Sequence, residues 1–280
     1  MNRIHFIFPY VLGFVFMLAF LPTFAQDNSI QKTIDSLNLV IHKRPADPFP
    51  VYHKANLFLI TGSKDEAFRF FKQVVLLFTQ NPDSLYRNNA ADSYYQMSLL
   101  TFTKNKKEAY NYALGALQIK PKEKLYRIQQ ARVLVEIPET KKDGINFYET
   151  LVKEYPTDTE VLLEYAAFLE RESPERASAM YEKVLRNNPT DAKSLFALGN
   201  YEVNAGLKQT KPDAATKHYL KAEGYLAAAL QQQPENDVYR KKLGDLYSTL
   251  AWYYKDQRNK EAAAKTKEYK QKLADLGLKN

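Results

Sequence analysis

One helical pattern recurs five times along this 280-residue chain and limits what it can fold into more than any other feature. Each copy starts at a small residue, and apolar residues follow mainly at positions i+3, i+4, i+7 and i+8, which form one face of an α-helix. The copies start at Ala67, Ala109, Gly144, Ala177 and Ala222. In the last four copies a proline twelve residues further on ends the helix. The pattern predicts a repeat protein.

A second apolar helix precedes each copy, and local signals mark where helices begin. Ser63 with Glu66, and Thr157 with Glu160, have the spacing of a capping box, in which a hydroxyl and a carboxylate each accept a bond from an orphan backbone amide. Residues 47–50 contain two prolines and are predicted to form a rigid turn, because each proline disfavours helical geometry at the residue before it.

The fold class that follows is all-α, an α-solenoid of stacked antiparallel helix pairs, because no segment alternates apolar and polar residues over a sustained length. One pair cannot bury both its faces, whereas a stack of pairs makes a continuous core. In the fifth pair, twelve extra residues are predicted to be mostly helix, with a loop only at about Ala205 to Lys211. The predicted segments are a signal peptide at 1–25, a capping helix at 26–45, a repeat domain at 46–275 and a tail at 276–280. The six predicted helix pairs lie near 46–82, 83–121, 122–156, 157–189, 190–234 and 235–275.

The repeat matches a known family in length and in key residues. Successive copies start 42, 35, 33 and 45 residues apart, and two of these steps bracket 34. Leu243-Gly244 with Tyr247 fits the first helix of a tetratricopeptide unit, and Ala177 with Tyr181 fits the second. Over about residues 46–275 the chain resembles a tetratricopeptide repeat (TPR) protein, in particular cell-envelope TPR proteins of Gram-negative bacteria. The resemblance implies a right-handed superhelix whose concave face, lined by first helices, holds a peptide or protein segment.

The N-terminus has the features of an export signal. Arg3 precedes an almost wholly apolar run from Phe6 to Leu21, and Thr23-Phe24-Ala25 places small residues where a signal peptidase cleaves. We therefore expect cleavage after Ala25 and localisation in the periplasm or cell envelope. An uncleaved membrane anchor is the alternative, since sixteen apolar residues fall only slightly short of a membrane span.

Charge and composition exclude several classes of function. The net charge of +8 comes from basic residues interleaved with acidic ones, which is typical of solvated helix faces and not of a nucleic-acid footprint. The densest basic zone is Lys255 to Lys279, so a peripheral contact with an anionic envelope surface stays open. The chain has no cysteine, its four histidines lack metal-ligand spacing, and no catalytic or nucleotide-binding motif occurs. We expect no cofactor, no metal and no enzymatic activity.

The leading hypothesis is an interaction scaffold of the bacterial cell envelope that binds a peptide or protein segment in its groove. The alternative is a structural or accessory subunit of an envelope assembly, which binds through its convex face or its basic C-terminal helix. The resemblance implies that first-helix residues pointing away from the buried stripe line the groove. Helical phase selects six candidates: Tyr126, Gln129, Lys193, Phe196, Asn200 and Lys241. Lys193, Phe196 and Asn200 share one helix face. The alternative is that Phe196 packs under the insertion at 205–217 and that Lys193 is merely solvated.

Overall fold

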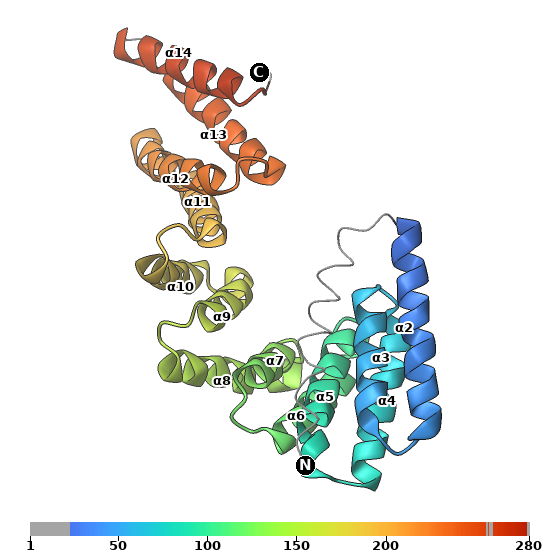
Figure 1. The fold of residues 1–280 in the computed structure, drawn as a ribbon. Helices are drawn as coiled ribbons and strands as arrows, with labels where there is room; N and C mark the ends of the chain where they lie inside the picture. The colour runs from blue at the N-terminus through green and yellow to red at the C-terminus, as the bar shows by residue number, and fades with distance from the viewer. Residues whose placement is uncertain (1–22, 256, 258–259, 279–280) are drawn as a thin grey trace. The chain divides into compact units, whose positions relative to one another are not determined.

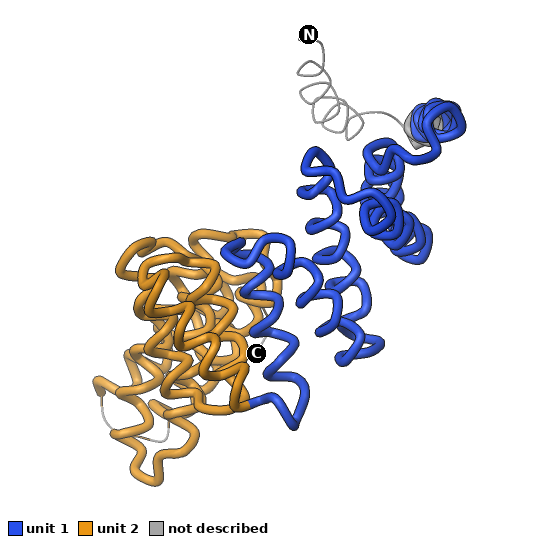
Figure 2. Tube along the Cα trace, turned by 90° about the horizontal axis from the view of Figure 1, so that it is seen from below, with its two compact units in different colours: residues 1–141 blue, residues 142–280 orange. Residues whose placement is uncertain are grey.

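The computed structural model describes residues 23–255, 257 and 260–278, and these residues form α-helices, two short 3₁₀ helices and no strand. The prediction of an all-α fold built from consecutive helix pairs is confirmed (Figure 1). The chain divides into two compact units, residues 1–141 and residues 142–280 (Figure 2). We call them unit 1 and unit 2.

Unit 1 consists of helix hairpins with an additional N-terminal helix. Its α-helices are α2 (Thr23–Lys43), α3 (Pro48–Ile60), α4 (Lys64–Gln80), α5 (Arg87–Thr101), α6 (Lys106–Ile119) and α7 (Lys124–Val135). The 3₁₀ helices are η1 (Ser84–Tyr86) and η2 (Pro138–Thr140). Helices α3 and α4 pack as one pair, α5 and α6 as the next, and α2 packs on α3. Val51, Phe71, Val74 and Met97 lie in the core between α3, α4 and α5.

Unit 2 continues the same architecture. Its helices are α8 (Lys141–Glu154), α9 (Thr159–Glu172), α10 (Pro174–Asn187), α11 (Ala192–Leu207), α12 (Pro212–Gln232), α13 (Asp237–Lys255) and α14 (Lys260–Asp275). Pairs form between α9 and α10, α11 and α12, and α13 and α14. The predicted role of small residues in close helix approach is confirmed at Gly199, where an added Cβ would lie 2.6 Å from Leu226 Cδ2.

Two predicted turns are wrong in detail. Residues 47–50 are not a separate turn: Asp47 caps α3 by accepting a bond from the Phe49 amide at 3.0 Å, and Pro48 opens the helix. Prolines fit there because the amides of a first helical turn have no intrahelical partner. The predicted loop at 205–211 shrinks to 208–211, because α11 continues to Leu207.

The helix caps are also simpler than the predicted boxes. Asp158, and not Thr157, caps α9, accepting a bond from the Val161 amide at 3.1 Å. Ser63 precedes α4 without a side-chain cap bond. The predicted N-cap position is therefore correct for α4, although its hydroxyl makes no cap bond, and lies one residue too early for α9.

The last helix is held to unit 2 by a polar network. Lys272 Nζ lies 2.7 Å from Glu223 Oε1 and 4.8 Å from the centre of the Tyr269 ring. Tyr269 Oη donates to the other Glu223 oxygen at 2.9 Å. Because Glu223 belongs to α12, these contacts fix α14 against the preceding pair.

Most of the predicted signal peptide, residues 1–22, lies outside the described residues. Cleavage after Ala25 therefore stays a prediction. Among the helices of the described part, none is both long and apolar enough to cross a membrane.

Candidate functional site

Two of the six groove candidates, Tyr126 and Gln129 on α7, are packing residues of unit 1. Gln129 is 2% exposed, and its Nε2 donates to Ser98 Oγ of α5 at 3.0 Å. Ser98 donates in turn to the carbonyl of Ala109 at 2.8 Å. Tyr126 is 6% exposed, with its ring centre 5.1 Å from that of Tyr95. The prediction that these two side chains face an open groove is wrong, because helical phase directs them toward α5.

The remaining four candidates lie in unit 2, where the structure brings them together only in part. Lys193 on α11 and Lys241 on α13 are exposed. The Phe196 ring stacks on Tyr239 with centroids 4.3 Å apart, so it joins α11 to α13 and does not offer a free ring to a partner. Asn200 alone lines a cleft. A binding role for Lys193, Asn200 and Lys241 stays a prediction.

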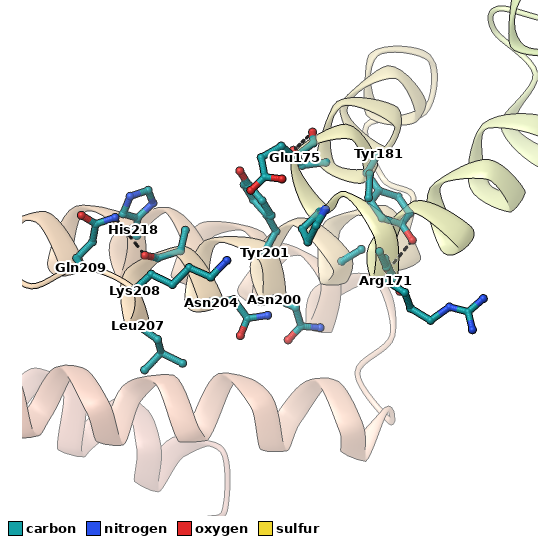
Figure 3. Close-up of a pocket in the computed structure, with 16 residues that line it drawn as sticks. Arg171, Glu175, Tyr181, Asn200, Tyr201, Asn204, Leu207, Lys208, Gln209 and His218 are labelled. Carbon is teal, nitrogen blue, oxygen red and sulfur yellow. Dashed lines mark hydrogen bonds between the residues drawn. The ribbon is translucent and has the colours of Figure 1, made fainter. Parts of the chain in front are cut away.

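The cleft at Asn200 lies within unit 2 and has a volume of about 900 Å³. Its walls come from the end of α9, the first half of α10, the second half of α11 and His218 of α12 (Figure 3). The side chains that matter most for its chemistry are Arg171, Tyr181, Asn200, Tyr201, Asn204 and Lys208.

The cleft exists because the pair of α11 and α12 is longer than the pair before it. Helix α10 starts at Pro174, three residues before the small residue Ala177, whereas α12 starts at Pro212, ten residues before the corresponding Ala222. At 1.5 Å per residue, α12 therefore begins about 10 Å earlier. The extended ends of α11 and α12 also pack closely, since a Cβ on Gly206 would lie 2.5 Å from Tyr219 Cε1. Leu207 and Lys208, at the extended end of α11, line the cleft together with Pro174 and Glu175 at the start of α10.

The floor of the cleft is one face of α11. Asn200, Asn204 and Lys208 follow one another at intervals of four residues, so their side chains share that face. Figure 3 shows the two amides on the same side of the helix. An asparagine amide both donates and accepts, and two amides one turn apart can pair with the N–H and C=O groups of an extended peptide. Lys208 is exposed and adds a cation at the end of the row.

The opposite wall carries carboxylates and a buried phenol. Tyr181 Oη donates to Glu170 Oε1 at 2.6 Å, which fixes that carboxylate at the rim. Burial raises the pKa of Tyr181, and the bond to Glu170 raises it further, so the phenol stays a neutral donor. At the far margin, His218 Nδ1 lies 2.6 Å from Glu202 Oε2. The cleft is thus polar and mixed in charge, suited to reversible recognition of a polar segment.

Sequence reasoning missed Tyr201, Asn204 and Lys208. Lys208 fell in the predicted loop at 205–211, whereas Tyr201 and Asn204 lay within the predicted helix and were not selected as groove residues. A usable signal was present, because Asn204 and Lys208 repeat Asn200 at the four-residue helical interval.

The described residues assemble no candidate metal site. No group of three or more His, Cys, Asp or Glu side chains in that part of the chain is placed to hold a metal ion. His42, His53 and His218 lie apart, on α2, α3 and α12.

Comparison with known families gives one match. A family model described as the plant-specific mitochondrial import receptor subunit TOM20 matches residues 149–267, which is less than half of the chain but includes the whole cleft. No curated protein matches the chain.

Comparison with solved structures identifies the fold. The chain is similar to the C-terminal part of a TPR repeat-containing protein from Cytophaga hutchinsonii, with 14% identity, a TM-score of 0.64 and coverage of 90% of this chain and 92% of the other. It is also similar to a tetratricopeptide repeat protein from Parabacteroides merdae, with 17% identity, a TM-score of 0.53 and coverage of 79% of each chain. A thermophilic TPR protein from Thermus thermophilus has 14% identity and a TM-score of 0.50, with coverage of 71% of this chain and 98% of the other. The chain has the tetratricopeptide-repeat fold.

Proposed function

We propose that this protein is a non-enzymatic interaction scaffold that binds an extended peptide or protein segment in the cleft of unit 2. The observation that carries the proposal is the face of α11 on which Asn200, Asn204 and Lys208 succeed one another inside a cleft of about 900 Å³. That volume matches the size of small-ligand pockets, so the cleft can seat a few residues of a longer segment.

Recognition would rest mainly on the backbone of the partner. The amides of Asn200 and Asn204 pair with main-chain groups of the segment, and the Tyr201 ring beside them offers apolar contact. Lys208 attracts a carboxylate of the segment, and Glu170, held by Tyr181, rejects a second carboxylate at the opposite wall. The preferred segment is therefore extended and has a single acidic residue or C-terminus at one end.

The matched family supports a binding role for this part of the chain. Its description is that of an import receptor subunit, and residues 149–267 contain every residue of the cleft. The absence of a catalytic motif from the sequence supports a scaffold over an enzyme.

The place of action that we propose is the periplasm or cell envelope, after cleavage behind Ala25. The charged start, the apolar run and Thr23-Phe24-Ala25 support this proposal. N-terminal sequencing of the exported protein should give Gln26 as the first residue. Recovery of only an intact Met1 species, in membranes, would instead support an anchor.

A second candidate function is that of an accessory subunit of an envelope assembly. It is favoured by α14, on which Lys267 and Lys270 are exposed while Tyr269 and Leu273 are buried. Cross-links that concentrate on α14, with none in the cleft, would favour this candidate.

The test of the scaffold proposal is a peptide-display selection against the full chain. Enriched peptides are then measured for binding to the wild type and to the double variant Asn200→Ala/Asn204→Ala. The matched control is Asn146→Ala, which removes an exposed asparagine of α8 that does not line the cleft. We expect the affinity of the double variant for the peptide to fall at least about tenfold, since each lost hydrogen-bonded contact with the peptide backbone contributes roughly 1 kcal/mol. Undiminished binding by the double variant would refute the assignment of the cleft.

A further inference from the structure

Two large apolar side chains of unit 2 are strongly exposed. Trp252 is 70% exposed and Leu207 is 68% exposed, more than any other large hydrophobic side chain among the described residues. Both lie at the C-terminal ends of their helices, Leu207 on α11 and Trp252 on α13. Large exposed apolar side chains gathered at one place indicate an interaction surface.

The two side chains occupy corresponding positions in successive repeats. Leu198-Gly199 on α11 and Leu243-Gly244 on α13 are the same element of the repeat, and Leu207 and Trp252 each lie eight residues after the glycine. The bond from Tyr253 Oη to Asp213 Oδ1, at 2.9 Å, further ties the end of α13 to the start of α12. Leu207 and Trp252 therefore belong to one edge of unit 2, the edge formed by the turns within helix pairs.

Lysines accompany both apolar residues on this edge. Lys208 and Lys211 follow Leu207, Lys255 follows Trp252, and all three are exposed. We call Leu207, Lys208, Lys211, Trp252 and Lys255 the basic edge. Two carboxylates lie near it: Asp213 accepts the Tyr253 bond, and exposed Glu261, in the first turn of α14, interacts electrostatically with Tyr254. The described part of the edge thus combines two apolar side chains with an excess of positive charge.

The α13 part of the basic edge extends further than the preceding first helices do, whereas α11 ends only eight residues past Gly199. Helix α13 extends eleven residues past Gly244, whereas α9 extends only six past Ala166, the small residue at the corresponding position. The difference is about 7.5 Å at 1.5 Å per residue. The turn between α9 and α10 carries exposed Glu172 and Glu175, and Glu175 lines the same cleft as Leu207 and Lys208.

We propose that the basic edge binds peripherally to an anionic phospholipid surface. Trp252 and Leu207 enter the headgroup region, where amphipathic rings are favoured, and the three lysines pair with lipid phosphates. A protein partner fits less well, because two apolar side chains among lysines are a small area for a stable interface, and lysine is depleted from interface cores. This contact does not depend on a peptide in the cleft, although Leu207 and Lys208 also border it.

The chain supplies its own probe, because Trp252 is its only tryptophan. We expect its fluorescence emission to shift to the blue when the full chain is mixed with phosphatidylcholine vesicles that contain phosphatidylglycerol. Pure phosphatidylcholine should cause no shift, and high salt should reverse it. The triple variant Lys208→Gln/Lys211→Gln/Lys255→Gln should lose about fivefold in vesicle affinity per lysine.

The matched control is Lys267→Gln/Lys270→Gln, which removes exposed lysines of α14 and should leave the shift unchanged. Circular dichroism of each variant checks that the variant is folded before its binding is measured. The proposal is overturned if anionic vesicles cause no shift, if neutral vesicles cause an equal one, or if only the α14 variant loses binding. A shift produced by a soluble envelope protein without lipid, and not by vesicles, would also overturn it and assign the edge to that protein. Peptide binding in the cleft is measured without lipid, so failure of either proposal leaves the other testable.

Discussion

Gly199 and Gly224 allow the packing of unit 2 to be tested with one kind of substitution. Both glycines are helical, Gly199 on α11 and Gly224 on α12. At Gly199 an added Cβ would lie 2.6 Å from both Cγ and Cδ2 of Leu226, which is fully buried. At Gly224 no atom lies within 4 Å of the added Cβ. Gly224→Ala should therefore stabilise unit 2, whereas Gly199→Ala should not.

The magnitudes follow from two opposing effects. Replacing a helical glycine by alanine stabilises the helix by about 1 kcal/mol. Overpacking against an immobile neighbour destabilises by about 1–3 kcal/mol. Gly224→Ala has only the first effect and should gain up to about 1 kcal/mol. Gly199→Ala has both and should range from about neutral to a loss of about 2 kcal/mol, so the two variants should differ by roughly 1–3 kcal/mol.

Hydrogen exchange of the backbone amides is the suitable assay, because repeats unfold locally and a single melting temperature does not describe them. Faster exchange in α11 and α12 is expected for Gly199→Ala, and slower exchange for Gly224→Ala. In a Leu226→Ala background the clash is gone, so Gly199→Ala should there become neutral or stabilising. Equal effects of the two glycine substitutions in the wild-type background would refute the close approach of α11 and α12.

Three further substitutions test the assignment of buried groups. Gln129→Ala should speed hydrogen exchange in α5 and α7 and leave peptide binding unchanged, because Gln129 bonds to buried Ser98. If the variant loses peptide binding but keeps its protection from exchange, Gln129 is a binding residue and not a packing residue. Burial raises the pKa of Asp92, so its ionised form destabilises the fold; Asp92→Asn should stabilise unit 1 at pH 7 in urea unfolding, and the gain should vanish as pH falls below the raised pKa. A gain that persists in acid would contradict this. Ala177→Asp places a charge at a buried site and should increase exchange around α9 and α10 while protection at Val75 persists; loss at both sites would contradict local coupling.

The sequence predicted the second helices of the repeat better than the first. Except for α12, each second helix of the five copies starts three residues before its small residue, each ends near a proline, and both signals are local. Gly199 could be assigned to a close contact because Leu198-Gly199 fixes the phase of α11. On α7, the family pattern places its small residue at Arg132. In the structure the small residue that is fully buried is Ala131, one position earlier. An error of one residue rotates a helix by about 100°, which is enough to misplace Tyr126 and Gln129.

The cleft was less predictable than the fold. Its position depends on the lengths of α11 and α12 relative to α9 and α10, and helix ends are the least certain part of a sequence-based assignment. The stack of Phe196 on Tyr239 joins residues 43 positions apart, and no local signal reports such a pair. Asn200 was selected by phase alone. The start of the longer helix at Pro212 was predicted, but the continuation of α11 to Leu207, with Gly206 packed against Tyr219, was not.

Hydrogen-exchange footprinting of the full chain with a bound display-selected peptide tests the central claim most directly. The account predicts that the peptide slows exchange in residues 197–208 of α11 and at the turn between α9 and α10, and that Asn200→Ala/Asn204→Ala abolishes this protection. Protection confined to unit 1 or to α14, or protection of α11 that survives in the double variant, would contradict it.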